Sequence, residues 1–265
     1  MSYNIIQGQS LFKHSVDEIP DLNDPDYKPH THSTNYELFY FISGDAYFNV
    51  DGYHYEMRNG TLLLIKPGTQ HNIVFKSNKK YERIVIRFKE SDLTAKLAEK
   101  IKETDNIYFV RNSELSKEIM RLDDHFSNLD NDWILFTFNN SLQIILSYVV
   151  NYRESELNNN QSDEVLKIVN YLNNNLLEIA DLKDICQDLN ISKSALCKKF
   201  TDAVGVPIMT YVRLKKLLLA RDLMENGQSP TTVYKQCGFN DYTAFYRAYK
   251  KTFQESPKKT KINNH

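Results

Sequence analysis

The chain has 265 residues, of which 41% are hydrophobic, and its 33 Lys and Arg residues nearly balance 34 Asp and Glu residues. This length suits two domains, and the hydrophobic content allows each of them a packed core. No apolar run approaches the length of a bilayer span and the N-terminus carries no basic-then-apolar signal region, so the sequence predicts a cytoplasmic protein rather than a membrane or secreted one.

Charge is distributed unevenly along the chain. Residues 163–265 carry 16 Lys and Arg residues against 11 Asp and Glu residues, a net +5, whereas the preceding 162 residues carry 17 against 23, a net -6. A basic C-terminal part suits phosphate binding, although a mild bias also occurs in proteins without a nucleic-acid partner. Cys186, Cys197 and Cys237 fit no zinc motif and are odd in number, which favours structural thiols in a reducing compartment.

Residues 1–90 have the pattern of β-structure. Short runs rich in aromatic and β-branched residues are separated by turn-forming pairs such as Asp51-Gly52 and Asn59-Gly60. The predicted strands are Glu37–Ile42, Tyr47–Val50, Thr61–Ile65, Asn72–Phe75 and Tyr81–Phe88. Many short strands at this turn spacing predict a small barrel or sandwich.

Two arginines lie in the last of these strands. Arg83 and Arg87 share one strand face with Val85, because side chains two apart point the same way. In a ligand cavity they would suit a carboxylate or a group of hydroxyls. We expect the other arrangement, in which this face is exposed.

From about Leu93 the apolar period becomes helical. Three stretches show it, namely Leu93 to Ile101, Leu115 to Leu122 and Trp133 to Tyr152. The last stretch is apolar over a broad face, which packing on the barrel explains in part. We expect the rest to form the seam of a homodimer, with Leu142 and Ile145 in it.

A polar stretch divides the chain into two predicted domains. Residues 156–163 show no apolar periodicity and are typical of a linker between a domain at 1–155 and a domain at 164–265. In the second domain a long helix, Ile208 to Met224, is predicted to hold two flanking units at a fixed separation.

Each flanking unit has the pattern of a short helix, a tight turn and a basic amphipathic helix. The first runs from Leu182 to Phe200, and the second, with Gly238 in its turn, from Val233 to Lys251. This is the pattern of the helix-turn-helix, which places a recognition helix in the major groove of DNA. Two such units about fifty residues apart indicate a DNA-binding protein.

From Glu164 onward the sequence resembles the AraC family of bacterial transcription regulators. The matching residues are Ser192, Leu196, Phe200, Gly205, Tyr211, Ala220, Gly238, Phe239, Phe245, Arg247, Lys250, Ser256 and Pro257. The departures are Cys186 and Tyr234 in place of Ala, Lys216 in place of Arg, and Gln254 in place of Gly. Gln254 suits a left-handed helix cap poorly. The resemblance implies an all-α, seven-helix domain that binds promoter DNA.

The N-terminal part resembles a cupin barrel. His30-Thr31-His32, Glu37 and Gly44 match the first cupin motif, and Gly60, Pro67-Gly68 and His71-Asn72 match the second. In the AraC family this barrel is the usual sensor, so the resemblance implies small-molecule sensing and dimerisation. A sugar as the effector rests on family analogy alone.

Three interpretations of His30, His32, Glu37 and His71 stay open. Three imidazoles and a carboxylate inside a barrel suit a divalent metal, as in metal-dependent cupin enzymes. The same groups can hydrogen-bond a polar effector, or they can be retained as structural hydrogen bonds of the barrel. We favour an effector pocket at these four residues and expect no metal and no cofactor.

The candidate DNA contacts lie on the second helix of each unit. Base contacts are expected from Ser194, Cys197, Lys198, Thr243, Tyr246 and Arg247. Phosphate contacts are expected from Lys193, Lys199, Lys250 and Lys251. On a generic helix these residues would form a solvated face, but their place on two matched helices favours DNA.

The sequence therefore predicts a transcription regulator that is not an enzyme. A cupin-like all-β barrel with appended helices senses a small molecule and forms a homodimer, and the all-α domain places two recognition helices in successive major grooves about 34 Å apart. RNA polymerase is a candidate further partner. The alternatives are a metal-dependent cupin enzyme with a DNA-binding tail, and a constitutive regulator whose barrel binds nothing and only dimerises.

Overall fold

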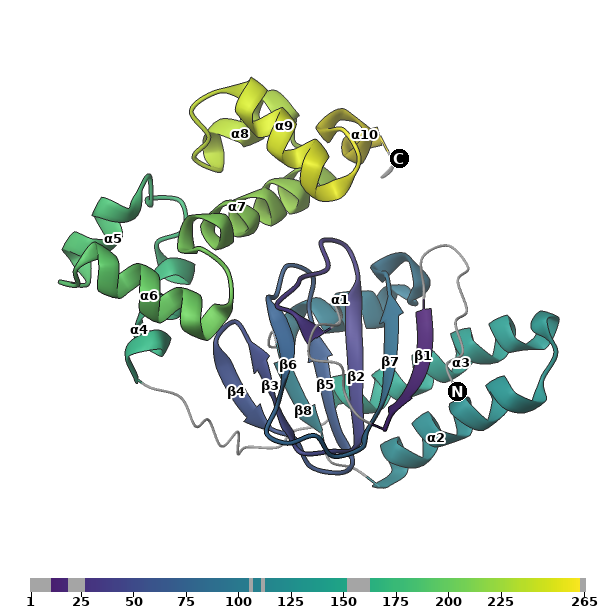
Figure 1. Cartoon of the computed structure of the whole chain (residues 1–265). Coiled ribbons are helices and arrows are strands. Elements are labelled where there is room, and N and C mark those ends of the chain that lie inside the picture. The colour runs from purple at the N-terminus through teal and green to yellow at the C-terminus, as the bar shows by residue number, and fades with distance from the viewer. Residues whose placement is uncertain (1–10, 19–26, 105–106, 111–112, 152–162, 263–265) are drawn as a thin grey trace.

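The computed structural model describes residues 11–18, 27–104, 107–110, 113–151 and 163–262 (Figure 1). Within them a β-rich domain with three helices precedes an all-helical domain. The predicted linker at 156–163 falls outside the described residues except for Asp163, the first residue of α4. The fold class predicted from the sequence, a β-domain followed by a helical domain, is confirmed.

The β-domain consists of two antiparallel sheets. The described strands are β1 (Leu11–Asp17), β2 (Tyr36–Ser43), β3 (Ala46–Val50), β4 (Tyr53–Glu56), β5 (Thr61–Ile65), β6 (His71–Phe75), β7 (Tyr81–Phe88) and β8 (Ile107–Val110). One sheet has the order β1-β7-β2-β5-β8 and the other β4-β3-β6. The sequence predicted the strands from β2 to β7 apart from β4, and it missed β1, β4 and β8.

Strand alternation gives the larger sheet two buried faces. In the pairing of β2 with β7, Leu38 lies opposite Ile86 and Glu37 lies opposite Arg87. Leu38 and Ile86 belong to the core between this sheet and the helices, and Phe39, on the other face, belongs to the core between the two sheets. Since successive side chains point to opposite faces, Glu37 and Arg87 point into the barrel.

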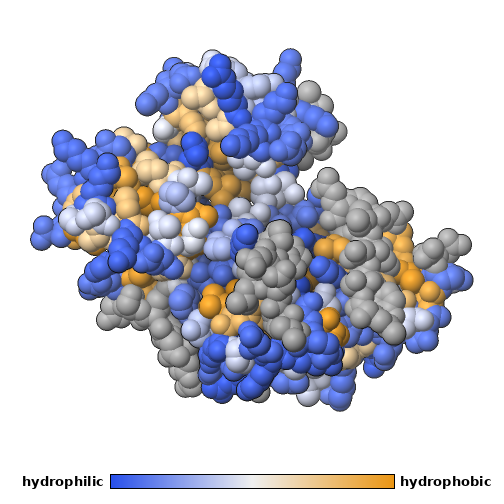
Figure 2. All heavy atoms as spheres, in the orientation of Figure 1, coloured by the Kyte–Doolittle hydropathy of each residue, from blue (hydrophilic) through white to orange (hydrophobic). Residues whose placement is uncertain are grey.

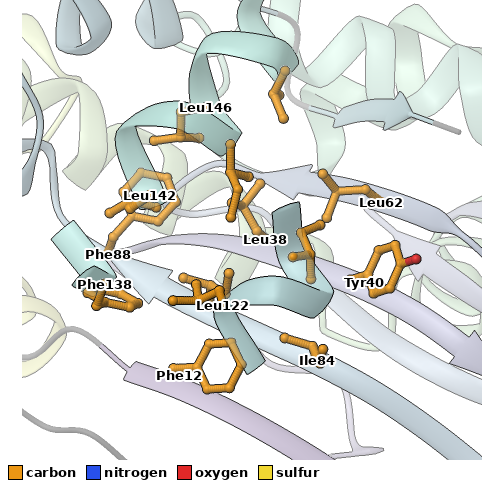
Figure 3. Packing of buried hydrophobic residues seen from close by; sticks show 14 of the residues in the cluster. Phe12, Leu38, Tyr40, Leu62, Ile84, Phe88, Leu122, Phe138, Leu142 and Leu146 are labelled. Carbon is orange, nitrogen blue, oxygen red and sulfur yellow. The ribbon is translucent and has the colours of Figure 1, made fainter. Parts of the chain in front are cut away.

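Three helices, α1 (Ala95–Glu103), α2 (Ser113–Asn128) and α3 (Asn131–Asn151), cover the outer face of the larger sheet. Figure 3 shows Leu142 and Leu146 of α3 packed over Leu38 and Phe88 of the strands. The stretch Trp133–Asn151 has the length and hydropathy of a membrane span, and 33% of it is buried; these buried residues pack on the sheet, which accounts for part of its apolar composition.

The prediction that Leu142 and Ile145 lie in a dimer seam is wrong. Both side chains are completely buried against the sheet of the same chain. Each such burial stabilises the domain by about 1.5–3 kcal/mol, so a charge there would unfold the domain instead of separating two subunits.

The helical domain contains α4 (Asp163–Asn174), α5 (Leu182–Asp188), α6 (Lys193–Val204), α7 (Ile208–Glu225), α8 (Pro230–Gln236), α9 (Tyr242–Phe253) and α10 (Pro257–Ile262). The N-terminal half of α7 packs in the core of the first helix-turn-helix unit through Tyr211, and its C-terminal half packs in the core of the second through Leu217 and Met224. The predicted connecting helix is therefore confirmed, and it belongs to both cores.

Candidate functional site

A cavity of about 210 Å³ lies inside the barrel between the two sheets. Phe39, Phe48 and Val85 line its middle, and polar groups line both ends. Along β7, Arg87 lies at one end and Arg83 at the other, separated by about 13 Å at the rise of a strand. The cavity can therefore hold a small molecule with polar groups around an apolar middle.

Of the four residues of the predicted effector pocket, His30, Glu37 and His71 line one end of this cavity, and His32 lies beside them. The rings of His30 and His71 are 4.4 Å apart, and His32 lies 5.2 and 5.3 Å from them between ring centroids. Glu37 Oε2 accepts from His32 Nε2 at 3.0 Å and from Arg87 Nε at 2.8 Å. The structure thus brings together residues that the two sequence motifs predicted to be neighbours.

Backbone carbonyls determine which ring nitrogens are protonated. His30 Nδ1 lies 2.8 Å from Lys28 O and His71 Nδ1 lies 2.9 Å from Thr69 O. A carbonyl oxygen only accepts, so each Nδ1 carries the hydrogen and each Nε2 presents a lone pair. His71 Nε2 is buried and has no hydrogen-bond partner among the described residues. Its lone pair is available to a hydrogen-bond donor or to a metal ion.

Burial also determines the charges of the cluster. Desolvation lowers the pKa of His71 to about 4 and lowers the pKa of His30. Burial alone would raise the pKa of Glu37, but the hydrogen bond from His32 and the nearby positive charge of Arg87 bring it below its ordinary value. At neutral pH this end of the cavity therefore presents two neutral imidazoles beside a paired carboxylate.

The opposite end of the cavity is built around Asp17. Its Oδ2 accepts from Tyr27 Oη at 2.6 Å and from Arg83 Nη1 at 2.8 Å, and the guanidinium of Arg83 lies 4.8 Å from the ring centre of Tyr81. The hydroxyl of Tyr81 is buried without a hydrogen-bond partner in the described chain. An unpaired buried hydroxyl costs free energy, so a polar ligand at this end would stabilise the fold.

The exposed strand face predicted for Arg83 and Arg87 is wrong. Both side chains line the cavity; Arg87 pairs with the buried carboxylate of Glu37, and Arg83 pairs with the partly exposed carboxylate of Asp17. The reason is visible in the intervening residues of β7. Ile84 and Ile86 take the face toward the helices, which leaves only the interior for the arginines.

The histidine cluster has donors that fit a divalent metal. One nitrogen from each of His30, His32 and His71 lies within 4.8 Å of the others. Their second ring nitrogens are held by a carbonyl or carboxylate, as is usual for metal-bound imidazoles. Glu37 is already paired with His32 and Arg87, so it would orient a ligand instead of binding the metal.

In the first helix-turn-helix unit, α6 presents the predicted contacts away from the core. Ser192 caps the helix and accepts from Ala195 N at 3.3 Å. Leu196 and Phe200 are buried, whereas Ser194 and Lys198 are exposed and Cys197 is half-buried. Lys193 is exposed, but Lys199 pairs with Glu164 of α4, which competes with its predicted phosphate contact.

The second unit repeats this arrangement on α9. Asp241 caps the helix and accepts from Ala244 N at 2.7 Å. Thr243 and Arg247 are exposed and Tyr246 is half-buried, at the same spacing as the three residues of α6. Lys250 and Lys251 are exposed in the last turn. In Figure 2 hydrophilic residues lie along the edges of the helical domain, with apolar residues visible between them.

Lys216 of α7 fixes the two units relative to each other. Its Nζ donates to Ile179 O, just before α5, at 2.7 Å. The same Nζ lies against Gly238 in the turn of the second unit, where an added Cβ would be 2.9 Å from it. Burial lowers the pKa of Lys216. The lysine that departs from the family pattern therefore connects both units at the centre of the domain.

Several residues of the site carried no signal in the sequence. Asp17 lies in β1, which was not predicted, and Tyr27 lies outside every predicted strand; Tyr81 begins a predicted strand, but its place at the cavity was not predicted. The alternation Ile84, Ile86, Phe88 could have placed Arg83 and Arg87 inside the barrel.

Two family models match the chain in succession. A model of the AraC-like ligand binding domain matches residues 19–131, and a model of a helix-turn-helix domain matches residues 185–262. Each corresponds to one of the two domains of the structure.

Curated relatives match the chain over less than half of its length. An uncharacterized HTH-type transcriptional regulator of Staphylococcus aureus is 26% identical over 119 residues, which are 43% of this chain and 16% of that protein. The xylose operon regulatory protein of Escherichia coli is 25% identical over 111 residues, 42% of this chain and 28% of that protein. The chain thus matches less than a third of the length of either relative.

Solved structures were also found. ToxT of Vibrio cholerae is 18% identical, with 95% of this chain and 97% of that chain covered and a TM-score of 0.39. The xylose-binding transcription activator xylR is 25% identical, with 44% and 30% covered and a TM-score of 0.36. With a ligand-binding domain of the AraC type followed by a helix-turn-helix domain, the chain belongs to the AraC family of transcription regulators.

Proposed function

We propose that the protein is a one-component regulator that binds double-stranded promoter DNA through α6 and α9 and responds to a small polar molecule in the barrel. The observation that carries the DNA-binding part is the matched pair of capped helices. Residues 194, 197 and 198 on α6 and residues 243, 246 and 247 on α9 have the same spacing and face away from the two cores. Such a pair fits two successive major grooves.

A duplex selected from random sequence by the full-length protein tests this proposal. Footprinting on that duplex should show two protected patches about one helical turn apart. Affinity should fall steeply with salt, since lysines and arginines that contact phosphates release counterions. Equal affinity for selected and random duplexes would contradict sequence-specific binding.

The sensing part rests on the buried polar groups of the cavity. His71 Nε2, which lies 3.7 Å from Glu37 Oε1, and the Tyr81 hydroxyl have no hydrogen-bond partner among the described residues and lie at opposite ends of one cavity. A ligand with several hydroxyl groups, a sugar among them, would satisfy both. Thermal-shift screening of small polar molecules should find one that stabilises the protein and changes its DNA affinity. A Glu37→Ala variant should lose that response and keep DNA binding. If no ligand changes DNA affinity, the barrel serves a constitutive regulator.

The histidine cluster favours one competing function, a metal-dependent cupin enzyme with a DNA-binding tail. Elemental analysis of the purified protein and a turnover assay separate the two functions. A regulator should hold little stoichiometric metal and turn over none of the molecules that stabilise it. One metal per chain, lost in the Glu37→Ala variant, would favour the metal-site interpretation.

The homodimer proposal now rests on the outer face of α3. Trp133 and Phe136 are 60% and 62% exposed, and Ile144 and Tyr148 follow on the same face. A second copy packed antiparallel would bury this uncharged stripe and place two DNA-binding domains about a two-fold axis. Phe136→Asp should give monomers in sedimentation, whereas the same change at exposed Met120 of α2 should not.

The regulator would act in the cytoplasm, with RNA polymerase as a candidate partner.

A further inference from the structure

The rim of the barrel under the helical domain is formed by two paired segments, residues 28–32 and 68–72, and by the turn between β3 and β4. The backbone N–H groups of His30 and His71 each donate to the other residue's carbonyl, at 3.1 and 2.9 Å. Gly68 N donates to His32 O at 2.8 Å. The segments that carry the three histidines of the cluster therefore also form the rim.

One buried side chain links the wall of the cavity to α6. Asn49 Nδ2 donates to Asn72 Oδ1 at 3.0 Å and to Ala203 O at 2.8 Å. Asn72 lines the cavity beside His71, and Ala203 lies in the last turn of α6. A movement of residues 71–72 is therefore transmitted to α6, the first recognition helix, through the side-chain amide of Asn49.

Asp51 makes a second link, to α7. Its Oδ1 accepts from Gln70 N at 2.9 Å, and its Oδ2 accepts from Tyr211 Oη at 3.3 Å and from Lys215 Nζ at 3.2 Å. The carboxylate is buried. A buried charge is costly unless it stays paired, so its position relative to α7 is strongly determined while the two domains are in contact.

Close backbone contacts complete the interface. A Cβ added to Gly205, which caps α6, would lie 2.3 Å from Pro29 Cγ, and one added to Gly68 would lie 1.8 Å from Leu218 Cδ1, on the half of α7 that packs in the second unit. Tyr53 of β4 packs against both the barrel core and the core of the first unit. By contrast, no backbone–backbone hydrogen bond joins α8 or α9 to the barrel within the described part of the chain.

We propose that this rim is a docking surface for the first helix-turn-helix unit, and that docking of the unit and occupation of the histidine end of the cavity are coupled. The proposal rests on the proposed function in one respect, that the cavity is the effector site. Residues 68–72 supply His71 and Asn72 to the cavity and Gly68 to the interface, and Gln70 N donates to Asp51, the carboxylate that pairs with Lys215 of α7. A ligand that moves this segment changes both, and the coupling is reciprocal by linkage.

Amide hydrogen exchange of the full-length protein, followed by mass spectrometry, tests the coupling without a known effector. Asn49→Ala removes the donor to Ala203 O, and His71→Ala changes the cavity without removing a side-chain contact to the helical domain. Both should speed exchange in peptides covering residues 200–212, by about two- to tenfold, the factor expected from loss of an ordinary hydrogen bond. Tyr81→Phe, at the far end of the cavity, is the matched control and should leave these peptides unchanged.

The outcomes separate the parts of the proposal. No change in residues 200–212 with Asn49→Ala would show that the rim does not dock the first unit. Faster exchange with Asn49→Ala but not with His71→Ala would show docking without coupling to the cavity. Because His71→Ala can weaken the barrel itself, His71→Asn is measured beside it, and only a variant with wild-type exchange in α3 is scored. Failure to bind any duplex would reject the proposed function and leave this exchange result intact.

Discussion

In the first helix-turn-helix unit α6 ends at Gly205, whereas in the second α9 ends at Gln254, and both residues have a positive φ, 82° and 58°. At Gly205 the barrel approaches so closely that a side chain would meet Pro29. Gln254 is exposed, and its side-chain amide donates to Lys251 O at 2.9 Å. The same cap therefore needs a glycine only where the unit contacts the sensor domain.

The comparison extends to the basic residues. Lys199 of the first unit is paired with Glu164, whereas Arg247, Lys250 and Lys251 of the second have no acidic partner within ion-pair distance among the described residues. Two copies of one motif thus differ in what surrounds them. The first is held by the barrel and by α4, and the second presents its positive charges to solvent.

Lowering the pH should destabilise the barrel beneath the first unit more than it destabilises the core of the second unit. Burial lowers the pKa of His71 to about 4 and also lowers that of His30. Between the ordinary value of about 6.5 and these lower values the unfolded chain binds more protons than the folded one, so stability falls as pH falls, by up to about 1.4 kcal/mol per pH unit for each histidine. Glu37 acts in the same direction, because its lowered pKa stabilises the fold above about 4.5 and this is lost on acidification.

Thermal unfolding between pH 7 and pH 5, with a chelator present, measures this effect. Trp133 is the single tryptophan and lies in α3, so its fluorescence reports the sensor domain. The unfolding temperature should fall toward pH 5, and His71→Gln should flatten the dependence. A pH-independent midpoint would show that the cluster is not buried and neutral as the structure has it.

Base recognition should depend more on the second unit than on the first. Arg247 can bind a guanine edge with two hydrogen bonds, whereas Lys198, at the matching position of α6, offers one compact charge. Arg247→Ala should weaken binding of the selected duplex by about 1–3 kcal/mol and relax the preference at one base pair. Lys198→Ala should cost less and change the preference less. Equal losses of specificity in a binding titration would remove this difference between the units.

Phosphate contacts should differ in the same way. Lys250 is exposed and positioned to meet a phosphate directly, whereas Lys199 must first leave Glu164. Lys250→Ala should therefore reduce the slope of log affinity against log salt by about 0.9, the value for one phosphate contact. Lys199→Ala should reduce it by less. A larger effect at Lys199 would mean that its pairing with Glu164 does not persist on DNA.

Local patterns in the sequence predicted much of the fold. Thr61–Ile65 and Tyr81–Phe88 were predicted with their observed bounds, because turn residues flank continuous apolar or alternating runs. β1 and β8 were missed for a physical reason. The sequence of β1, with Lys13 and His14 at its centre, has no apolar alternation, and β8 has four residues, so both depend on pairing with β7 and β5.

The residues of the candidate site also differ in whether the sequence could predict that they meet. His30, His32 and Glu37 lie within eight residues of one another, so a local motif could predict that they meet. Arg83 and Asp17 are 66 residues apart, and Asn49 and Ala203 are 154 apart. No local pattern predicts such pairs, since they follow from how the strands and the two domains pack.

The two caps give the smallest and most direct test of the comparison. A residue other than glycine in the left-handed region costs about 1–2 kcal/mol, offset in part by the larger entropy that glycine loses on folding. Gln254→Gly should therefore stabilise the helical domain by about 0.5–1 kcal/mol, measured by urea unfolding followed by far-ultraviolet circular dichroism. Gly205→Ala, the matched change in the first unit, should destabilise the protein and speed exchange in residues 28–32, because its Cβ would displace Pro29. If both substitutions changed stability by their backbone preference alone, the contact with the barrel would play no part in selecting Gly205.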